Sequence, residues 1–183
     1  STIREKSSLE GKGVKPLYGH PNEQSFLFEA TPDFPEQLKA LRILTHFQNG
    51  YMPNGIFLTH AHIGHYTGLM YLGKEAFNSH RTTVFAMPKM QRFLEKNGPW
   101  NQLIYEKNIE IQPLLNKTYY HINSLIKVKP FLVPHRDEYS ETVGYQIEGP
   151  NKTALFIPDI NKWHEWEEDI MEKITLVNYA FID

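Results

Sequence analysis

Three histidines, His60, His62 and His65, lie within six residues of one another, directly after the apolar run at residues 55–58. Each imidazole has two ring nitrogens that need polar partners, so three of them are costly in a packed core. His60 and His62 project to the same side of an extended segment, and His65 can return to that side from the first turn of a following helix. The spacing therefore predicts a metal site at a strand end, with a functionless surface cluster as the alternative.

Two further strand ends carry groups that can join this site. His135 follows an apolar run at residues 130–133, and Asp159 follows an apolar strand expected at residues 153–157. Layered α/β folds collect functional groups at strand ends along one edge of a sheet. Alone, His135 would be read as a structural histidine and Asp159 as a turn or cap residue. Together with the cluster, they predict five metal ligands: His60, His62, His65, His135 and Asp159.

The loop after His135 is rich in polar side chains. We predict that Arg136, Glu138 and Tyr139 face a small-molecule substrate, with an ordinary solvated loop as the alternative. Asp159 is the predicted catalytic residue, because a carboxylate beside a metal ion can orient the attacking water.

The chain contains no cysteine, which excludes disulfides, thiolate ligands and a cysteine nucleophile. A metal ion must therefore be held by histidine nitrogens and carboxylate oxygens. Zinc, as one or two ions, is the expected cofactor, and iron or manganese also suits such a set of ligands.

The composition is that of a folded protein, with 183 residues, 40% of them hydrophobic, and a net charge of −2. This predicts a single domain over residues 1–183, in which residues 1–20 form a loop or an arm. No basic block indicates a nucleic-acid partner. No apolar run approaches the roughly 20 residues that span a bilayer. The first residue is serine, so the compartment is unknown and the cytoplasm is only the default expectation; the oligomeric state is unknown as well.

Hydrophobic periodicity and Gly/Pro punctuation predict an α/β (α+β) layered fold, in which strands and helices alternate before a β-meander. Strands are expected at residues 25–30, 56–58, 82–86, 109–115, 119–133, 143–148, 153–157 and 176–182. Helices are expected after residues 31–35 and at residues 66–77, 88–96 and 163–174. The strand at 56–58 lacks alternation, which indicates burial on both faces, and residues 149–152 form a hairpin-type turn.

Residues 59–65 resemble the His-x-His-x-Asp-His signature of the metallo-β-lactamase fold superfamily. His135 is similar to the histidine of its third motif, and Asp159 to the aspartate of its fourth. The Gly-Tyr strand that usually follows the third motif has its counterpart at residues 143–147. Within the superfamily, the segments around the histidines look most like the branch of pyrroloquinoline-quinone biosynthesis protein B. The resemblance extends from about residue 25 onward.

This resemblance implies a four-layer αββα sandwich with the site at one edge, between two sheets. It assigns His60, His62 and His135 to a first metal ion, Asp159 to a bridging or completing position, and His65 to a second ion. Gly64 departs from the signature, because the family has a metal-binding aspartate at that position. This substitution favours a single ion. The family also expects a later segment with a final ligand histidine, so the sandwich is expected to be incomplete at its C-terminal end.

Three functions follow from these residues and from the resemblance. The first is a metal-dependent hydrolase, in which a metal-activated water attacks an ester, an amide or a phosphoester. The second is a mononuclear iron oxidoreductase related to quinone-cofactor biosynthesis. The third is a metal-binding domain without catalysis, for which Gly64 is the best argument.

Overall fold

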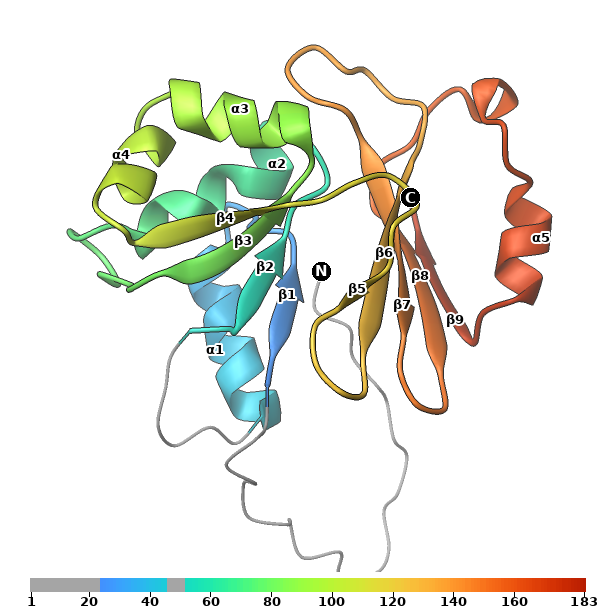
Figure 1. The fold of residues 1–183 in the computed structure, drawn as a ribbon, viewed down its shortest axis with the longest axis horizontal. Helices are drawn as coiled ribbons and strands as arrows, with labels where there is room; N and C mark the ends of the chain where they lie inside the picture. The colour runs from blue at the N-terminus through green and yellow to red at the C-terminus, as the bar shows by residue number, and fades with distance from the viewer. Residues whose placement is uncertain (1–23, 46–51) are drawn as a thin grey trace, which may run out of the picture.

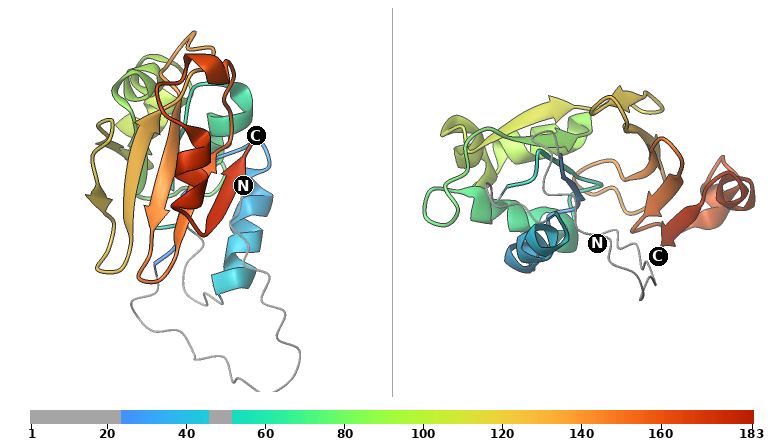
Figure 2. Two further views of the ribbon diagram at one scale, coloured as in Figure 1. Left: turned by 90° about the vertical axis from the view of Figure 1, so that its right-hand side faces the viewer. Right: turned by 90° about the horizontal axis from the view of Figure 1, so that it is seen from below.

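Two β-sheets lie face to face, and helices cover the outer face of each, as Figure 1 shows. The computed structural model describes residues 24–45 and 52–183, so the predicted arm at residues 1–20 lies outside the described residues. The layer order is helix, sheet, sheet, helix, and the turned views in Figure 2 show the same arrangement. The predicted αββα sandwich is confirmed.

The first sheet is entirely parallel, with the strand order β1-β2-β3-β4. Its strands are β1 (Phe26–Phe28), β2 (Gly55–Phe57), β3 (Thr82–Ala86) and β4 (Ile109–Pro113). The helices of this half are α1 (Phe34–Thr45), α2 (Ile63–Tyr66), the 3₁₀ helix η1 (Thr67–Leu72), α3 (Pro88–Lys96) and α4 (Trp100–Tyr105). They form the crossovers that parallel strands require.

The second sheet is a meander, in which β5 to β8 pair antiparallel and β9 returns parallel to β8. Its strands are β5 (Tyr120–His121), β6 (Lys127–Leu132), β7 (Val143–Glu148), β8 (Thr153–Ile157) and β9 (Tyr179–Ile182). The predicted hairpin turn joins β7 and β8, where Gly149 N–H donates to the Lys152 carbonyl at 2.8 Å. The 3₁₀ helix η2 (Trp163–Glu165) and α5 (Ile170–Thr175) follow β8. None of the helices in the described ranges is long and apolar enough to cross a membrane.

Three apolar clusters hold the four layers together, one at each interface between layers. β2 and the residue after it contribute to two of them: Ile56 and Leu58 pack toward the helices, while Phe57 packs between the sheets. The Phe57 ring stacks on Phe28 at 4.9 Å and on Phe85 at 4.2 Å between ring centroids. Burial of β2 on both faces, predicted from its unbroken apolar run, is confirmed, and this fixes the strand that leads into the histidines.

The prediction of a helix at residues 66–77 was wrong in its bounds and partly in its type. The observed helical segment begins at Ile63, ends at Leu72 and is mostly 3₁₀. The cause is a pair of backbone hydrogen bonds to a neighbouring segment. Gly68 N–H donates to the Ala30 carbonyl at 2.9 Å, and Ala30 N–H donates to the His65 carbonyl at 3.0 Å. These bonds occupy groups that an α-helix would pair internally. They also attach the His65 segment to the end of β1.

The acidic segment at residues 163–174 is not one helix. Its Trp166 ring stacks on Phe131 with 5.9 Å between ring centroids, and Trp166 Nε1–H donates to the Leu132 carbonyl at 3.0 Å. These contacts hold the segment extended between η2 and α5. Asp169 then caps α5 by accepting a hydrogen bond from Met171 N–H at 2.7 Å.

The structure differs from the sequence analysis at two other places. Helix α4 was not predicted, because the Asn97-Gly98-Pro99 stop signal hid a second short helix that buries Leu103. The strand expected at 119–133 is two strands separated by a turn, where Asn123 Oδ1 accepts two backbone N–H bonds at 2.8 Å.

We predict that Gly68→Ala lowers the free energy of unfolding by about 1–3 kcal/mol. A Cβ atom at position 68 would lie 2.1 Å from the Thr31 carbonyl oxygen, which is backbone and cannot move aside cheaply. Gly64→Ala is the matched control, because a Cβ at position 64 meets no heavy atom of the described residues within 4 Å. Urea denaturation of the metal-free proteins measures both changes, and equal losses would contradict the close approach at Gly68.

Candidate metal centre

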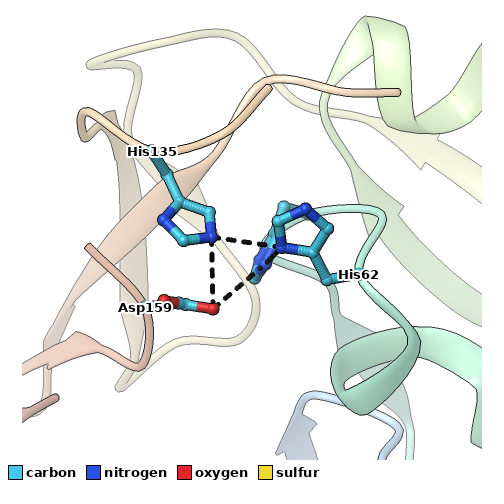
Figure 3. A group of neighbouring side chains, drawn as sticks. His62, His135 and Asp159 are labelled. Atoms are coloured by element: carbon cyan, nitrogen blue, oxygen red, sulfur yellow. Dashed lines mark hydrogen bonds and ion pairs between the residues drawn. The ribbon is translucent and has the colours of Figure 1, made fainter. Parts of the chain in front are cut away.

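Side chains from three strand ends converge at one edge of the sandwich. His60 and His62 follow β2, His135 follows β6 and Asp159 follows β8. Figure 3 shows His62, His135 and Asp159 facing one another across the gap between the sheets. One ligand atom from each of the four residues lies within 4.8 Å of the others. His60 is buried, and the side chains of His62 and Asp159 are 20% and 23% exposed, so one side of the group meets solvent.

The distances between these ligand atoms fit one metal ion. His62 Nδ1 lies 2.8 Å from His60 Nε2 and 3.1 Å from His135 Nε2. Asp159 Oδ2 lies 3.4 Å from His60 Nε2 and 3.3 Å from His135 Nε2. Ligands about 2.1 Å from a tetrahedral zinc ion are separated by roughly 3.4 Å. The donor types and their spacing therefore suit a small divalent ion.

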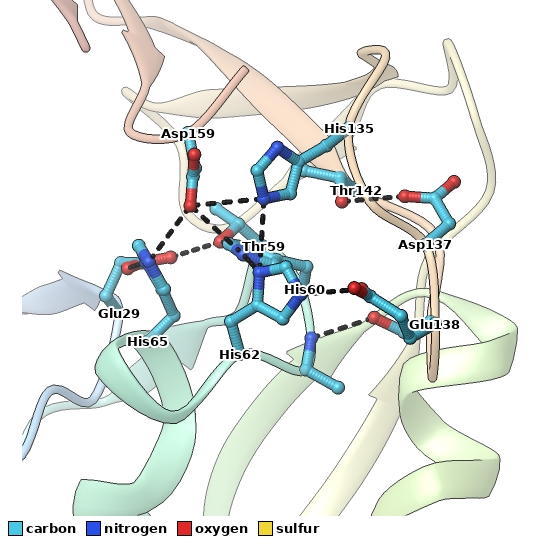
Figure 4. A network of polar contacts seen from close by, with 12 residues as sticks. Glu29, Thr59, His60, His62, His65, His135, Asp137, Glu138, Thr142 and Asp159 are labelled. Atoms are coloured by element: carbon cyan, nitrogen blue, oxygen red, sulfur yellow. Dashed lines mark hydrogen bonds and ion pairs between the residues drawn. The ribbon is translucent and has the colours of Figure 1, made fainter. Parts of the chain in front are cut away.

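A buried carboxylate that sequence analysis missed, Glu29, fixes the rings of two histidines (Figure 4). The Thr59 hydroxyl donates its proton to Glu29, and His65 Nδ1 pairs with the other oxygen of the same carboxylate. Because the Thr59 hydroxyl has no second proton, His60 Nδ1–H must be the donor in their 3.0 Å contact. His60 therefore turns an unprotonated Nε2 toward the centre, and His65 turns its Nε2 to the same side. The only sequence signal for Glu29 was one carboxylate directly after the apolar residues of β1.

His62 has the opposite orientation. Its Nε2 lies 2.8 Å from Glu138 Oε2, so Nε2 carries the proton and Nδ1 is left unprotonated. In the neutral form of His62, its Nδ1 and His60 Nε2 thus face each other at 2.8 Å with no proton between them. Two lone pairs at this distance repel each other unless a cation lies between them. A proton or a metal ion at this point relieves the repulsion, and the convergence of four ligand atoms suits the metal ion.

Burial keeps two of these imidazoles neutral. It lowers the pKa of His60 to about 2, and the neighbouring charges of His65, His62 and His135 act in the same direction. Burial also lowers the pKa of His135, although the Asp159 charge opposes this shift. Neutral imidazoles can bind a metal ion without first losing a proton.

His65 stands beside the group rather than in it. Its Nε2 lies 3.5 Å from Asp159 Oδ2, and its ring lies 4.3 Å from that of His60 between centroids. Burial lowers the pKa of His65, but the hydrogen bond and the charge of Glu29 outweigh it and raise the pKa. Of the five predicted ligands, the structure thus brings four into one group and places the fifth at its border.

The predicted substrate-facing residues all lie on the exposed loop after His135. The ring of Tyr139 packs against Phe93 at 5.6 Å between centroids and is otherwise exposed. Glu138 contacts His62, and this hydrogen bond lowers the pKa of the Glu138 carboxyl. Arg136 is exposed, and its positive charge contributes to the lowered pKa of His60 and of His135. A role of these three residues toward substrate stays a prediction.

A family model described as the β-lactamase superfamily domain matches residues 24–183. The chain belongs to this superfamily, as the histidine signature predicted. No curated protein matches the chain.

Solved structures share its fold. Zn(2+)-bound PqqB from Methylobacterium extorquens has 20% sequence identity and a TM-score of 0.65; the match covers 86% of this chain and 55% of the PqqB chain. A metallo-β-lactamase variant from Cronobacter sakazakii has 13% identity and a TM-score of 0.54, covering 82% and 60% of the two chains. The subclass B3 enzyme MEM-A1, from a soil metagenome library, has 15% identity and a TM-score of 0.51, covering 75% and 54%. The predicted likeness to the PqqB branch thus holds at the level of the fold, and the chain spans little more than half of these proteins.

We predict that His60→Ala and His135→Ala each weaken zinc binding by at least about 100-fold, because loss of a ligand should cost more than loss of a group that only orients one. His65→Ala should have a smaller effect, since His65 lies outside the group of four. His80→Ala is the control, because His80 is exposed and far along the chain from the strand ends. Competition with a chelator measures the dissociation constants, and equal loss in all four variants would contradict the ligand assignment.

Proposed function

We propose that this chain is the metal-binding catalytic part of a hydrolase, with one zinc ion held by His60, His62, His135 and Asp159. The observation that carries the proposal is the convergence of one ligand atom from each of these four residues within 4.8 Å of the others. The neutral state of the buried histidines and membership of the superfamily support it. The substrate is a small molecule with an ester, amide or phosphoester bond.

The protein groups have distinct tasks in this proposal. A bound divalent ion supplies Lewis acidity, which activates water and polarises the substrate oxygen. Asp159 turns Oδ2 toward the histidines, and its partial exposure lets its carboxylate accept a hydrogen bond from the attacking water and orient it. Arg136 and Tyr139, on the exposed loop after His135, contact the substrate. The positive charge of Arg136 suits the negative charge that develops on a carbonyl or phosphoryl oxygen.

A single ion is favoured over two. Gly64 occupies the position of the aspartate that the superfamily signature places there, and the space around it is open within the described residues. His65 has its Nδ1 bound by Glu29 and offers only Nε2 to the centre. One imidazole nitrogen and a shared Asp159 oxygen make a weak second site.

An iron-dependent oxidoreductase is the second candidate. Three histidines and one carboxylate around a single ion also suit iron, which works at sites with vacant positions. The similarity of fold to PqqB favours this candidate, although the PqqB structure is described as zinc-bound.

The decisive experiment loads the metal-free protein separately with zinc and with ferrous iron. Each form is tested for hydrolysis of p-nitrophenyl acetate, p-nitroacetanilide and bis(p-nitrophenyl) phosphate, and for oxygen consumption. We expect zinc-dependent hydrolysis in the wild type and only background rates in His60→Ala. Oxygen consumption by the iron form without hydrolysis by the zinc form would support the second candidate, and failure to bind either metal would contradict both.

We predict that Gly64→Asp raises the metal content from one to two zinc ions per chain. The open space at position 64 accepts a side chain, and the new carboxylate would add a ligand beside His65 and Asp159. Gly64→Asn is the matched control, because it has nearly the same size but no charge. Elemental analysis after removal of excess zinc measures the content. Two ions in the wild type would contradict the single-ion proposal.

A further inference from the structure

We propose that Glu138 is a positioning residue, which orients His62 for metal binding through a hydrogen bond to the ring nitrogen that faces away from the metal. The inference rests on the metal centre proposed above. It gives Glu138 a different role from the substrate contact predicted from the sequence.

The orientation of the His62 ring creates the need for such a residue. His60 turns Nε2 toward the centre, whereas His62 turns Nδ1 toward it, at 2.8 Å from His60 Nε2 and 3.1 Å from His135 Nε2. The outer nitrogen of His62 is therefore Nε2, and it must carry the proton for Nδ1 to act as a ligand. Histidine ligands commonly donate this outer N–H to a carboxylate, which fixes the ring and strengthens its basicity.

The buried groups that hold the other rings do not contact His62. Thr59 and Glu29 contact the Nδ1 atoms of His60 and His65 from inside the protein. Figure 4 shows the outer nitrogen of His62 pointing the other way, toward the loop that carries Glu138. Glu138 Oε2 meets that nitrogen at 2.8 Å. The carboxylate for His62 thus comes from the second half of the chain.

Fixed points on both sides of Glu138 hold the loop in place. Ala61 lies between His60 and His62, and its N–H donates a hydrogen bond to Ser140 Oγ at 2.8 Å. The Thr142 hydroxyl donates to Asp137 Oδ1 at 2.9 Å, which closes the loop on the other side. Although the Glu138 side chain is 48% exposed, its backbone is therefore held close to His62.

The test measures zinc dissociation constants by chelator competition for the wild type, Glu138→Ala, Glu138→Gln and Asp137→Asn. We expect Glu138→Ala to weaken zinc binding about 10- to 100-fold. Glu138→Gln should weaken it less, because the amide oxygen still accepts the Nε2–H bond. Asp137→Asn is the matched control: it removes one charge from the same loop, keeps the acceptor for Thr142 and should leave the constant unchanged.

Melting temperatures of the metal-free proteins separate positioning from a structural role. An exposed pair contributes little stability, so the metal-free variants should melt with the wild type, while zinc should raise the melting temperature of Glu138→Ala less than that of the wild type. Three results would each overturn the inference. Glu138→Ala could bind zinc as tightly as the wild type, or Asp137→Asn could lose as much zinc affinity as Glu138→Ala. The melting temperature of Glu138→Ala could also fall by the same amount with and without zinc. If the wild type binds no zinc, the proposed function fails as well, whereas equal binding by wild type and Glu138→Ala overturns the role of Glu138 alone.

Discussion

Hydrogen bonds between the two sheets at the end of β2 bring His60, His62, His135 and Asp159 together. The buried Tyr145 hydroxyl donates to the Leu58 carbonyl, and Val143 N–H donates to the Thr59 carbonyl at 3.3 Å. A buried polar group left without a partner costs about 1–3 kcal/mol, so these bonds strongly favour one placement. They join β2 of the first sheet to the start of β7 in the second.

That junction explains the convergence of three strand ends. β7 lies between β6 and β8 and runs antiparallel to both, so the ends of β6 and β8 flank its start. His135 follows the end of β6, and Asp159 follows the end of β8. Attaching β2 to the start of β7 therefore brings His60 and His62 between them. Packing of the aromatic residues between the sheets fixes the distance between the two sheets. The hydrogen bonds fix which residues at the end of β2 lie opposite the start of β7.

Much of this arrangement could be predicted from the sequence, for physical reasons that differ between elements. The strands β3, β7 and β8 and the helix α3 have the predicted bounds, because proline, glycine and polar residues mark their ends. The segment after His65 was mispredicted because its backbone bonds to Ala30, which is remote in sequence. Local periodicity contains no information about such a partner.

The residues of the candidate site divide in the same way, into those that local sequence reveals and those that depend on remote contacts. Histidine spacing and strand ends were enough to select His60, His62, His135 and Asp159. Glu29 was not selected, since a single carboxylate after a strand is a common turn or cap residue. Its φ of 78° places it in the left-handed region, which a non-glycine residue adopts at a cost. Only the contacts with Thr59 and His65 reveal that this strained, buried carboxylate sets the protonation of two rings.

Asp159 is the residue on which the choice between the two candidate chemistries depends. Three histidines and a coordinated Asp159 would fill the four positions of a tetrahedral zinc ion, which is the pattern of a structural site. Hydrolysis would then require either a fifth ligand, which zinc accepts as a reaction proceeds, or an Asp159 that turns to the water instead.

The Oδ2 atom of Asp159 lies 3.3–3.5 Å from the Nε2 atoms of His60, His135 and His65, so more than one histidine competes for it. Iron needs no such adjustment, because its higher coordination number leaves positions vacant beside the same four ligands. His65 is the histidine of these three that lies outside the group of four, so its contact with Asp159 competes with those of two proposed ligands. Gly64 and His65 therefore bear on the same question in the proposed site: the glycine leaves out a ligand for a second ion, and the histidine lies beside the carboxylate that a single ion would use.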